Sequence, residues 1–199
     1  MTAFRRSPSR AFSLVELLIT IAIICILSVM LYGFGSASHQ RTQKQLCGDN
    51  LQKIFLASQI YANDFGGKFP QTNAVTSEDV LELLVPKYTA DTTIFICPGG
   101  RDSQIPSQAD LRKYKTSYAY YMGRSNSMQE ILLSDRQINA LPKNVGEQVF
   151  SLNGKPPGNN HHKFGGNFLF TDGGVQSSKA RAEFSLVFSN GIVLLNPKP

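Results

Sequence analysis

The 199-residue sequence predicts an α+β fold in which a long N-terminal helix packs on a C-terminal antiparallel sheet. An uncharged apolar segment near the N-terminus runs into a second segment whose apolar residues recur every three or four positions, up to residue 65. The last third instead contains short β-rich runs separated by turn dipeptides. We therefore divide the chain into a basic leader, 1–11, the apolar half of the helix, 12–35, and a globular domain, 36–199.

The apolar segment is long enough to cross a membrane once. No Asp, Glu, Lys or Arg occurs between Glu16 and Arg41, a gap of 24 residues. As a helix, residues 17–34 would span roughly 27 Å, close to the thickness of a bilayer's hydrocarbon core. The basic residues that precede this run form a flank that keeps the N-terminus in the cytoplasm. These residues are Arg5, Arg6 and Arg10.

The net charge of +6 does not predict a nucleic-acid-binding protein. Without residues 1–11 the chain has 17 basic and 14 acidic residues, and they are mixed along the sequence. No run of basic residues is present that could follow a phosphate backbone. We therefore expect no nucleic acid among the partners.

Three interpretations of the N-terminal segment compete. An ordinary export signal would fit the basic flank and the apolar run, with a cut near the small residues of "GSAS" at 35–38. A plain membrane anchor would fit them equally well. Neither explains Glu16, because an acidic residue inside an apolar helix costs about 3 kcal/mol on insertion scales, and less near the helix end.

The third interpretation uses this carboxylate. The stretch "RAFSLVELLITIAII" at residues 10–24 resembles the class III signal of type IV prepilins and type II secretion pseudopilins. The resemblance implies that Ala11 ends the leader, where the family usually has Gly. It further implies that prepilin peptidase cuts after Ala11 and methylates the new amine of Phe12. Glu16 then stands at the position of the acidic residue that the family retains.

The same resemblance gives Glu16 a role in assembly. A buried carboxylate needs a cationic partner, and the free amine of Phe12 on a neighbouring subunit would supply one. The alternative, without a role in assembly, is that Glu16 reaches the lipid headgroups at the helix end. The implied protein is a structural subunit of a pseudopilus or type IV pilus-like fibre, without enzymatic activity or a required cofactor. Its implied partners are the membrane, prepilin peptidase, an inner-membrane assembly platform with its ATPase, and other pilin or pseudopilin subunits.

That family would place the chain in the bacterial inner membrane as a single-pass protein. Its N-terminus would be cytoplasmic, and its globular domain would be periplasmic or part of an extracellular fibre. The alternative is a membrane-tethered or secreted binding module of the cell envelope that never polymerises.

Beyond the apolar segment, the sequence predicts one helix over residues 12–65 and a short second helix. The second helix begins at Thr76, where Asp79 follows at capping-box spacing, and stops at Pro86. Three β-rich runs follow in the middle of the chain. They are "TIFICP" at 93–98, "SYAYYM" at 117–122 and "EILLSD" at 130–135.

Two hairpins are predicted near the C-terminus. Asp172-Gly173 lies between the short apolar runs of "GGNFLFTDGGVQSS", residues 165–178. Asn190-Gly191 stands in the same way within "EFSLVFSNGIVLL", residues 183–195. Both dipeptides favour the positive φ angles that tight hairpin turns require.

A second and less specific resemblance covers this region. His162 is followed by nine residues and then Asp172-Gly173, which is similar to the H-X9-DG region of one large group of pseudopilin-like proteins. Motifs of that group also resemble the segments around "ANDFGGKFP", Cys97-Pro98 and "LLSD", in this order. Together the two resemblances cover most of the chain.

The candidate metal-binding or hydrolytic residues are His161, His162, Asp135 and Asp172. Their spacing matches no zinc motif or EF-hand loop, and neither a nucleophile elbow nor a P-loop occurs. The pilin resemblance allows a calcium ion near Asp172, with His162 as a second candidate ligand. Otherwise Asp172 serves the turn and His162 packs locally. A metal-dependent hydrolase would need His162, Asp172 and Asp135 to converge in a pocket.

The three cysteines also leave alternatives open. Cys25 lies in the apolar run and would be a small hydrophobic side chain. Cys47 and Cys97 could form a disulfide outside the cytoplasm, or they could be two reduced core cysteines.

Overall fold

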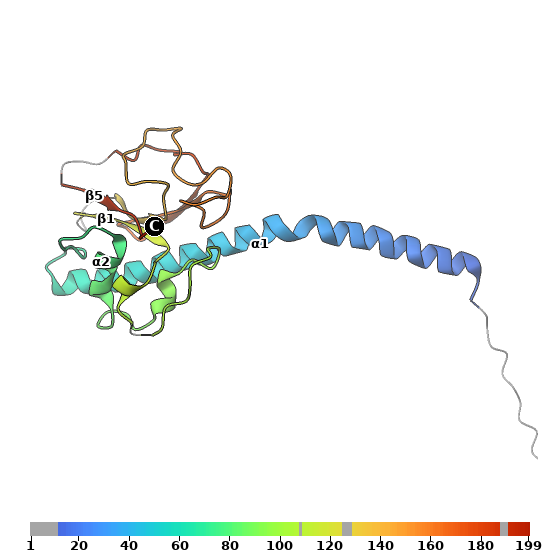
Figure 1. Cartoon of the computed structure of the whole chain (residues 1–199), viewed down its shortest axis with the longest axis horizontal. Coiled ribbons are helices and arrows are strands. Elements are labelled where there is room, and N and C mark those ends of the chain that lie inside the picture. Colours follow the sequence, from blue (N-terminus) through green and yellow to red (C-terminus); the bar gives the residue numbers. More distant parts are fainter. Residues whose placement is uncertain (1–11, 108, 125–128, 188–190) are drawn as a thin grey trace, which may run out of the picture. The chain divides into compact units, whose positions relative to one another are not determined.

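The computed structural model describes residues 12–107, 109–124, 129–187 and 191–199, and only the backbone of residues 32–37. The chain forms two compact units, which we describe separately: an N-terminal helical unit up to His39, and a unit from Gln40 to Pro199 (Figure 1). The observed α+β architecture is the predicted one.

Helix α1 runs without interruption from Leu14 to Asp64, in agreement with the predicted helix over 12–65. It contains no proline, and it ends where two glycines follow. The N–H of Gly67 donates to the carbonyl of Ala62 at 2.8 Å and closes the last turn. From Cys47 onward, buried residues recur every three or four positions, among them Leu51 and Ile54, which gives this half of the helix one apolar face.

The predicted second helix is also present, as helix α2, Ser77–Leu81, followed by a 3₁₀ turn η1, Glu82–Leu84. Its capping box forms as expected, because Oδ2 of Asp79 accepts the N–H of Thr76 at 2.9 Å. A further 3₁₀ turn, η3 at Leu111–Lys113, interrupts the polar segment before the sheet.

Five strands form one antiparallel sheet in the order β4-β3-β2-β1-β5. The strands are β1, Tyr118–Met122; β2, Ile131–Asp135; β3, Gly166–Phe170; β4, Val175–Ser178; and β5, Val193–Leu195. The hairpin between β3 and β4 is the one predicted at Asp172-Gly173, and Gly173 has the positive φ (84°) that this turn needs.

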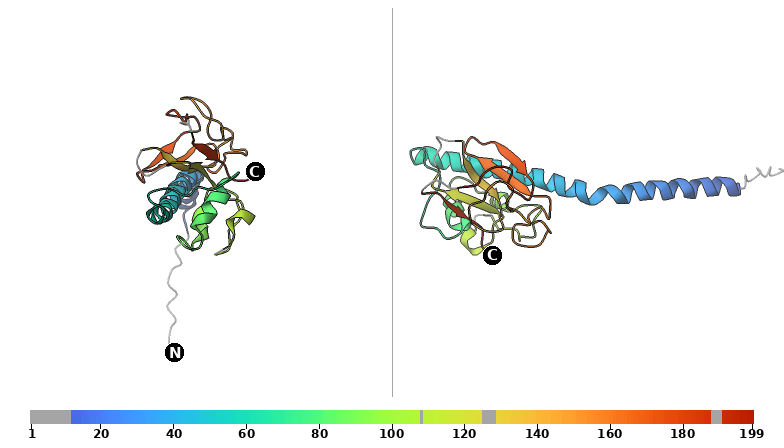
Figure 2. Two further views of the ribbon diagram at one scale, coloured as in Figure 1. Left: turned by 90° about the vertical axis from the view of Figure 1, so that its left-hand side faces the viewer. Right: turned by 90° about the horizontal axis from the view of Figure 1, so that it is seen from above.

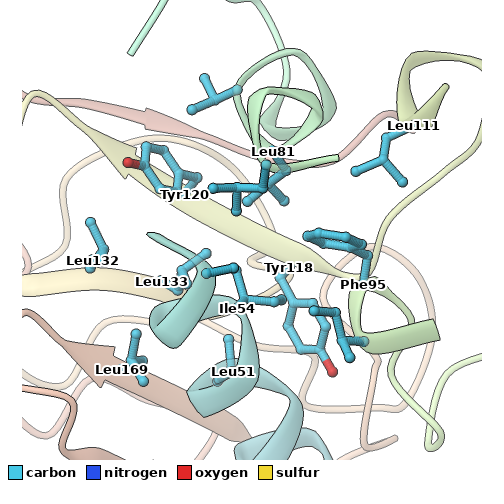
Figure 3. Packing of buried hydrophobic residues seen from close by; sticks show 14 of the residues in the cluster. Leu51, Ile54, Leu81, Phe95, Leu111, Tyr118, Tyr120, Leu132, Leu133 and Leu169 are labelled. Atoms are coloured by element: carbon cyan, nitrogen blue, oxygen red, sulfur yellow. The ribbon is translucent and has the colours of Figure 1, made fainter. Parts of the chain in front are cut away.

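Each face of the sheet carries a buried apolar cluster, and alternation along β1 divides its side chains between the two. Tyr118 and Tyr120 belong to the larger apolar cluster, on the face covered by α1 and α2. Figure 3 shows Leu51 and Ile54 of α1 pointing into this cluster beside the sheet. Ala119 and Tyr121 belong to a second cluster on the other face, which the long segments before and after β3 and β4 cover (Figure 2).

The prediction of a strand at 93–98 is wrong. The first part of this run is instead a 3₁₀ turn, η2 at Thr92–Phe95. The cause is Asp91, whose Oδ1 accepts the N–H of Thr93 at 3.0 Å and caps the turn. A local side-chain hydrogen bond therefore overrides the β propensity of the run.

The second predicted hairpin, at Asn190-Gly191, is also wrong in its pairing. Strand β5 pairs with β1, with Leu194 opposite Tyr121, and not with residues 183–187. Leu186 makes only an isolated bridge to Lys143. Because β1 would otherwise be an unpaired edge, β5 covers it. Asn190 itself lies outside the described residues.

Candidate functional site

The first site is the start of helix α1. The carbonyl of Ser13 accepts the N–H groups of Glu16, at 3.0 Å, and Leu17, at 3.2 Å, and so forms the first turn. Phe12 directly precedes this turn and is exposed. Ala11 and the leader arginines lie outside the described residues.

Glu16 lies in the first turn of α1 and is solvent-exposed. A carboxylate there is favoured by the positive end of the helix dipole. Within the described part of the chain, Glu16 takes part in no ion pair. Its charge is therefore free for a partner outside the described residues.

The residues after Glu16 form a segment suited to lipid. Leu14–Leu31 has a mean hydropathy of 2.8, and none of its residues is buried by the rest of the chain. The hydroxyls of Thr20 and Ser28 donate to the carbonyls of Leu17 and Ile24, at 2.8 and 2.7 Å, so neither needs water. The described residues thus contain one helix that is long and apolar enough to cross a membrane.

The second site is a buried cluster in the globular unit, which we call the cysteine–histidine–aspartate cluster: Cys47, Cys97, Asp135 and His161. It joins four separate segments: α1, the residue pair after η2, the end of β2 and the turn before β3. All four residues are at most 1% exposed. The structure joins Cys47 and Cys97 in a disulfide, with their Cα atoms 5.3 Å apart.

Asp135 is the charged centre of this cluster. Its Oδ2 accepts the backbone N–H of Asn167 at 2.7 Å and Nε2–H of His161 at 3.1 Å, and its Oδ1 accepts Nδ2–H of Asn160 at 3.0 Å. Complete burial opposes its ionisation most strongly. The nearby His161 charge and the three hydrogen bonds outweigh burial and hold the pKa of the Asp135 carboxyl below its usual value.

His161 links the carboxylate to the sulfurs. Its Nε2 lies 3.1 Å from Oδ2 of Asp135 and 3.6 Å from Sγ of Cys97. Gly99 allows this close approach, because a Cβ at that position would lie 2.8 Å from the Asn160 carbonyl oxygen and 2.9 Å from Nδ1 of His161. One potential ligand atom from each of the four residues lies within 4.8 Å of the other three.

The other two nominated residues, His162 and Asp172, are not part of this cluster. His162 is exposed and adopts a positive φ of 55°. Asp172 serves the β3–β4 turn, where Oδ1 accepts the N–H of Gly174 at 2.8 Å and Oδ2 accepts Nε2–H of Gln129 at 2.7 Å. They lie at opposite ends of β3, so the convergence with Asp135 that a hydrolase would require does not occur.

The sequence thus indicates Asp135 and His161 as candidate residues but does not connect them with the cysteines. Their separations along the chain follow no local metal motif, because each comes from a different element of the fold. The available signals were His161 next to His162 and the Cys97-Pro98 pair, neither of which specifies a partner.

Comparison with known families supports the first site. Residues 6–32 match the family model described as the prokaryotic N-terminal methylation motif, so the chain carries a prepilin-type N-terminal segment. This segment and the apolar helix fit a pilin-like protein anchored by a single membrane span. No curated protein and no solved structure is significantly similar to the chain.

Proposed function

We propose that this protein is a structural subunit of a type II secretion pseudopilus or type IV pilus-like fibre, and not an enzyme. The observation that carries the proposal is the methylation motif at residues 6–32, placed on a helix whose side chains up to Leu31 are all unburied within the chain. Such a surface must be covered by lipid or by other subunits.

The processing step follows from the motif. Prepilin peptidase cuts after Ala11 on the cytoplasmic side and methylates the amine of Phe12. The new N-terminus then stands at the start of the helix, four residues before Glu16. The globular unit lies on the opposite side of the inner membrane, in the periplasm or in a fibre.

Glu16 gives assembly its axial register. In an apolar bundle an unpaired carboxylate costs about 2.5–3.5 kcal/mol. Pairing with the amine of Phe12 on a neighbouring subunit removes much of this cost, and only one axial offset brings the two charges together. The assembly platform and its ATPase would supply the work of inserting each subunit.

The processing test is intact mass and N-terminal sequencing of the protein from membranes of a host with a working prepilin peptidase. We expect a chain that begins at N-methylated Phe12. A chain that begins near Ser38, or that retains Met1 or Thr2, would contradict the proposal and favour the tethered or secreted binding module.

The assembly test compares Glu16→Gln with Asp49→Asn, a matched change of an exposed carboxylate on the same helix. We expect Glu16→Gln to be processed normally but to be lost from sheared or cross-linked fibres, because the charge pair is missing. Asp49→Asn should assemble like the parent. Equal assembly of both variants would show that Glu16 does not set the register.

A further inference from the structure

The cysteine–histidine–aspartate cluster contains the donor types of a zinc site: two sulfurs, one imidazole nitrogen and one carboxylate oxygen. We propose that this cluster binds one Zn²⁺ when the Cys47–Cys97 disulfide is reduced, so that the disulfide and the metal are alternative states of one site. This inference concerns the globular unit and does not depend on the proposed fibre function.

The two observed distances from Nε2 of His161 fit tetrahedral coordination. With ordinary zinc bond lengths, a tetrahedron has edges of about 3.3 Å between N and O and about 3.6 Å between N and S. Nε2 of His161 lies 3.1 Å from Oδ2 of Asp135 and 3.6 Å from Sγ of Cys97. The four ligand atoms lie within 4.8 Å of one another, so small side-chain movements suffice to close the site.

The edge between the two sulfurs explains why reduction must come first. Two thiolates on one zinc ion are about 3.8 Å apart, and sulfurs that are bonded to each other cannot serve as thiolate ligands. Reduction of the disulfide takes up two electrons and two protons and gives two thiols. Zinc then displaces the two thiol protons and the proton on Nε2 of His161, so the site holds two thiolates, the Asp135 carboxylate and a neutral His161 imidazole that coordinates through Nε2.

The donor set selects the metal. Two thiolates with an imidazole and a carboxylate suit zinc, whereas calcium and magnesium require oxygen ligands. All four positions would be filled by protein atoms at a buried site, which is the arrangement of a structural zinc site and not of a catalytic one.

The surroundings of Asp135 resemble the outer shell of a metal site. Asn160 and the backbone N–H of Asn167 hold the carboxylate in place from two directions. Such outer hydrogen bonds orient metal ligands and strengthen binding. With zinc in place, α1 would remain attached to the sheet even in a chain whose cysteines are not oxidised.

The test uses the full chain in detergent, with Cys25→Ser to remove the third thiol. A trialkylphosphine and water reduce the disulfide and yield the phosphine oxide and two thiols. After the phosphine is removed without oxygen, the protein is titrated with Zn²⁺ and, separately, with Co²⁺. We expect about one metal ion per reduced chain and the visible spectrum of tetrahedral cobalt with thiolate ligands, and no binding by the oxidised chain.

Two variants separate this site from surface binding. Loss of an outer-shell partner weakens metal binding by up to about 100-fold. Because His161→Gln removes a direct ligand, it should weaken zinc binding by at least this much. His162→Gln, a change at the exposed neighbouring histidine, should bind zinc like the parent. His161→Gln could also impair folding. We therefore also measure, in the parent, whether Zn²⁺ protects Cys47 and Cys97 from an alkylating reagent.

The proposal is overturned if the reduced parent binds no stoichiometric zinc, or if zinc leaves the alkylation rates of Cys47 and Cys97 unchanged. Equal zinc affinity of the His161→Gln variant and the parent would also overturn it. Stoichiometric binding by the oxidised chain would refute the idea that disulfide and metal exclude each other. A reduced chain that loses its near-ultraviolet dichroism and does not regain it with zinc would count against the site as well.

Discussion

Replacing Cys47 and Cys97 together by alanine should strongly destabilise the globular unit. The disulfide closes a loop between residues 50 positions apart in the sequence. In the chain-entropy description, a loop of this length contributes about 4 kcal/mol at 25 °C. For a protein of this size each kcal/mol changes the melting temperature by about 2–4 °C, so we expect a loss of about 8–16 °C.

The assay is thermal unfolding of the full chain in detergent, followed by near-ultraviolet circular dichroism. The chain has seven tyrosines and no tryptophan, and Tyr118, Tyr120 and Tyr121 are fully buried, so the signal reports on the sheet. The double variant is compared with the parent in a Cys25→Ser background, with a chelator present throughout. The reduced parent with chelator should match the double variant.

A loss below about 1 kcal/mol for the double variant would refute this reasoning. It would mean that the unfolded chain is already compact enough for the cross-link to exclude few conformations. In a parallel measurement without chelator, Zn²⁺ that raised the melting temperature of the reduced parent but not that of the double variant would have to act through the two sulfurs.

Three further predictions concern packing, capping and the turn. Leu51→Ala should cost about 2–5 kcal/mol in the free energy of unfolding measured by urea denaturation, whereas Leu56→Ala, at an exposed position of the same helix, should cost about 0.5 kcal/mol or less. Asp79→Asn should cost about 1 kcal/mol through loss of the capping box. Because the hydrogen bond from the Thr76 backbone lowers the pKa of Asp79, this stabilisation should be present above the pKa of an ordinary aspartate and be lost as the pH falls through the lowered pKa; a difference between Asp79→Asn and the parent that persists unchanged to strongly acidic pH would contradict it. Gly173→Ala should cost about 1–3 kcal/mol, since its φ is positive and a Cβ would lie 2.8 Å from the Phe55 ring, and thermal unfolding without a decrease would contradict this.

Periodicity along the chain predicted the elements that depend on local pattern. Helix α1 was predictable because its apolar residues keep helical spacing, and because Gly66 and Gly67 mark its end. The capping box at Thr76 and the hairpin at Asp172-Gly173 were predictable because each is a local motif. The two failures, at 93–98 and 183–195, came from interactions that compete with a local pattern: a side-chain cap in the first and a distant strand partner in the second.

The buried cluster shows the same limit at the level of a site. Asp135 and His161 could be nominated from residue type alone, but their neighbours in space are separated from them by long stretches of sequence. Only the register of β2 with β3 brings the end of β2 to the turn before β3. The sequence could therefore supply the candidate residues but not the contact with Cys97.

The contrast between the two parts of α1 bears on the proposed assembly. From Cys47 onward the helix buries a regular apolar face against its own domain, and that burial stabilises it there. Between Leu14 and Leu31 no side chain is buried, so folding of the chain alone leaves this apolar surface exposed. Lipid could cover it as readily as other subunits could. In the proposed fibre, the free amine of Phe12 on a neighbouring subunit would place a fixed cation at Glu16, whereas the lipid tails would not. In the proposed assembly, this charge pair is what distinguishes a subunit of a fibre from a simple anchor, and for that reason Glu16→Gln is the decisive variant.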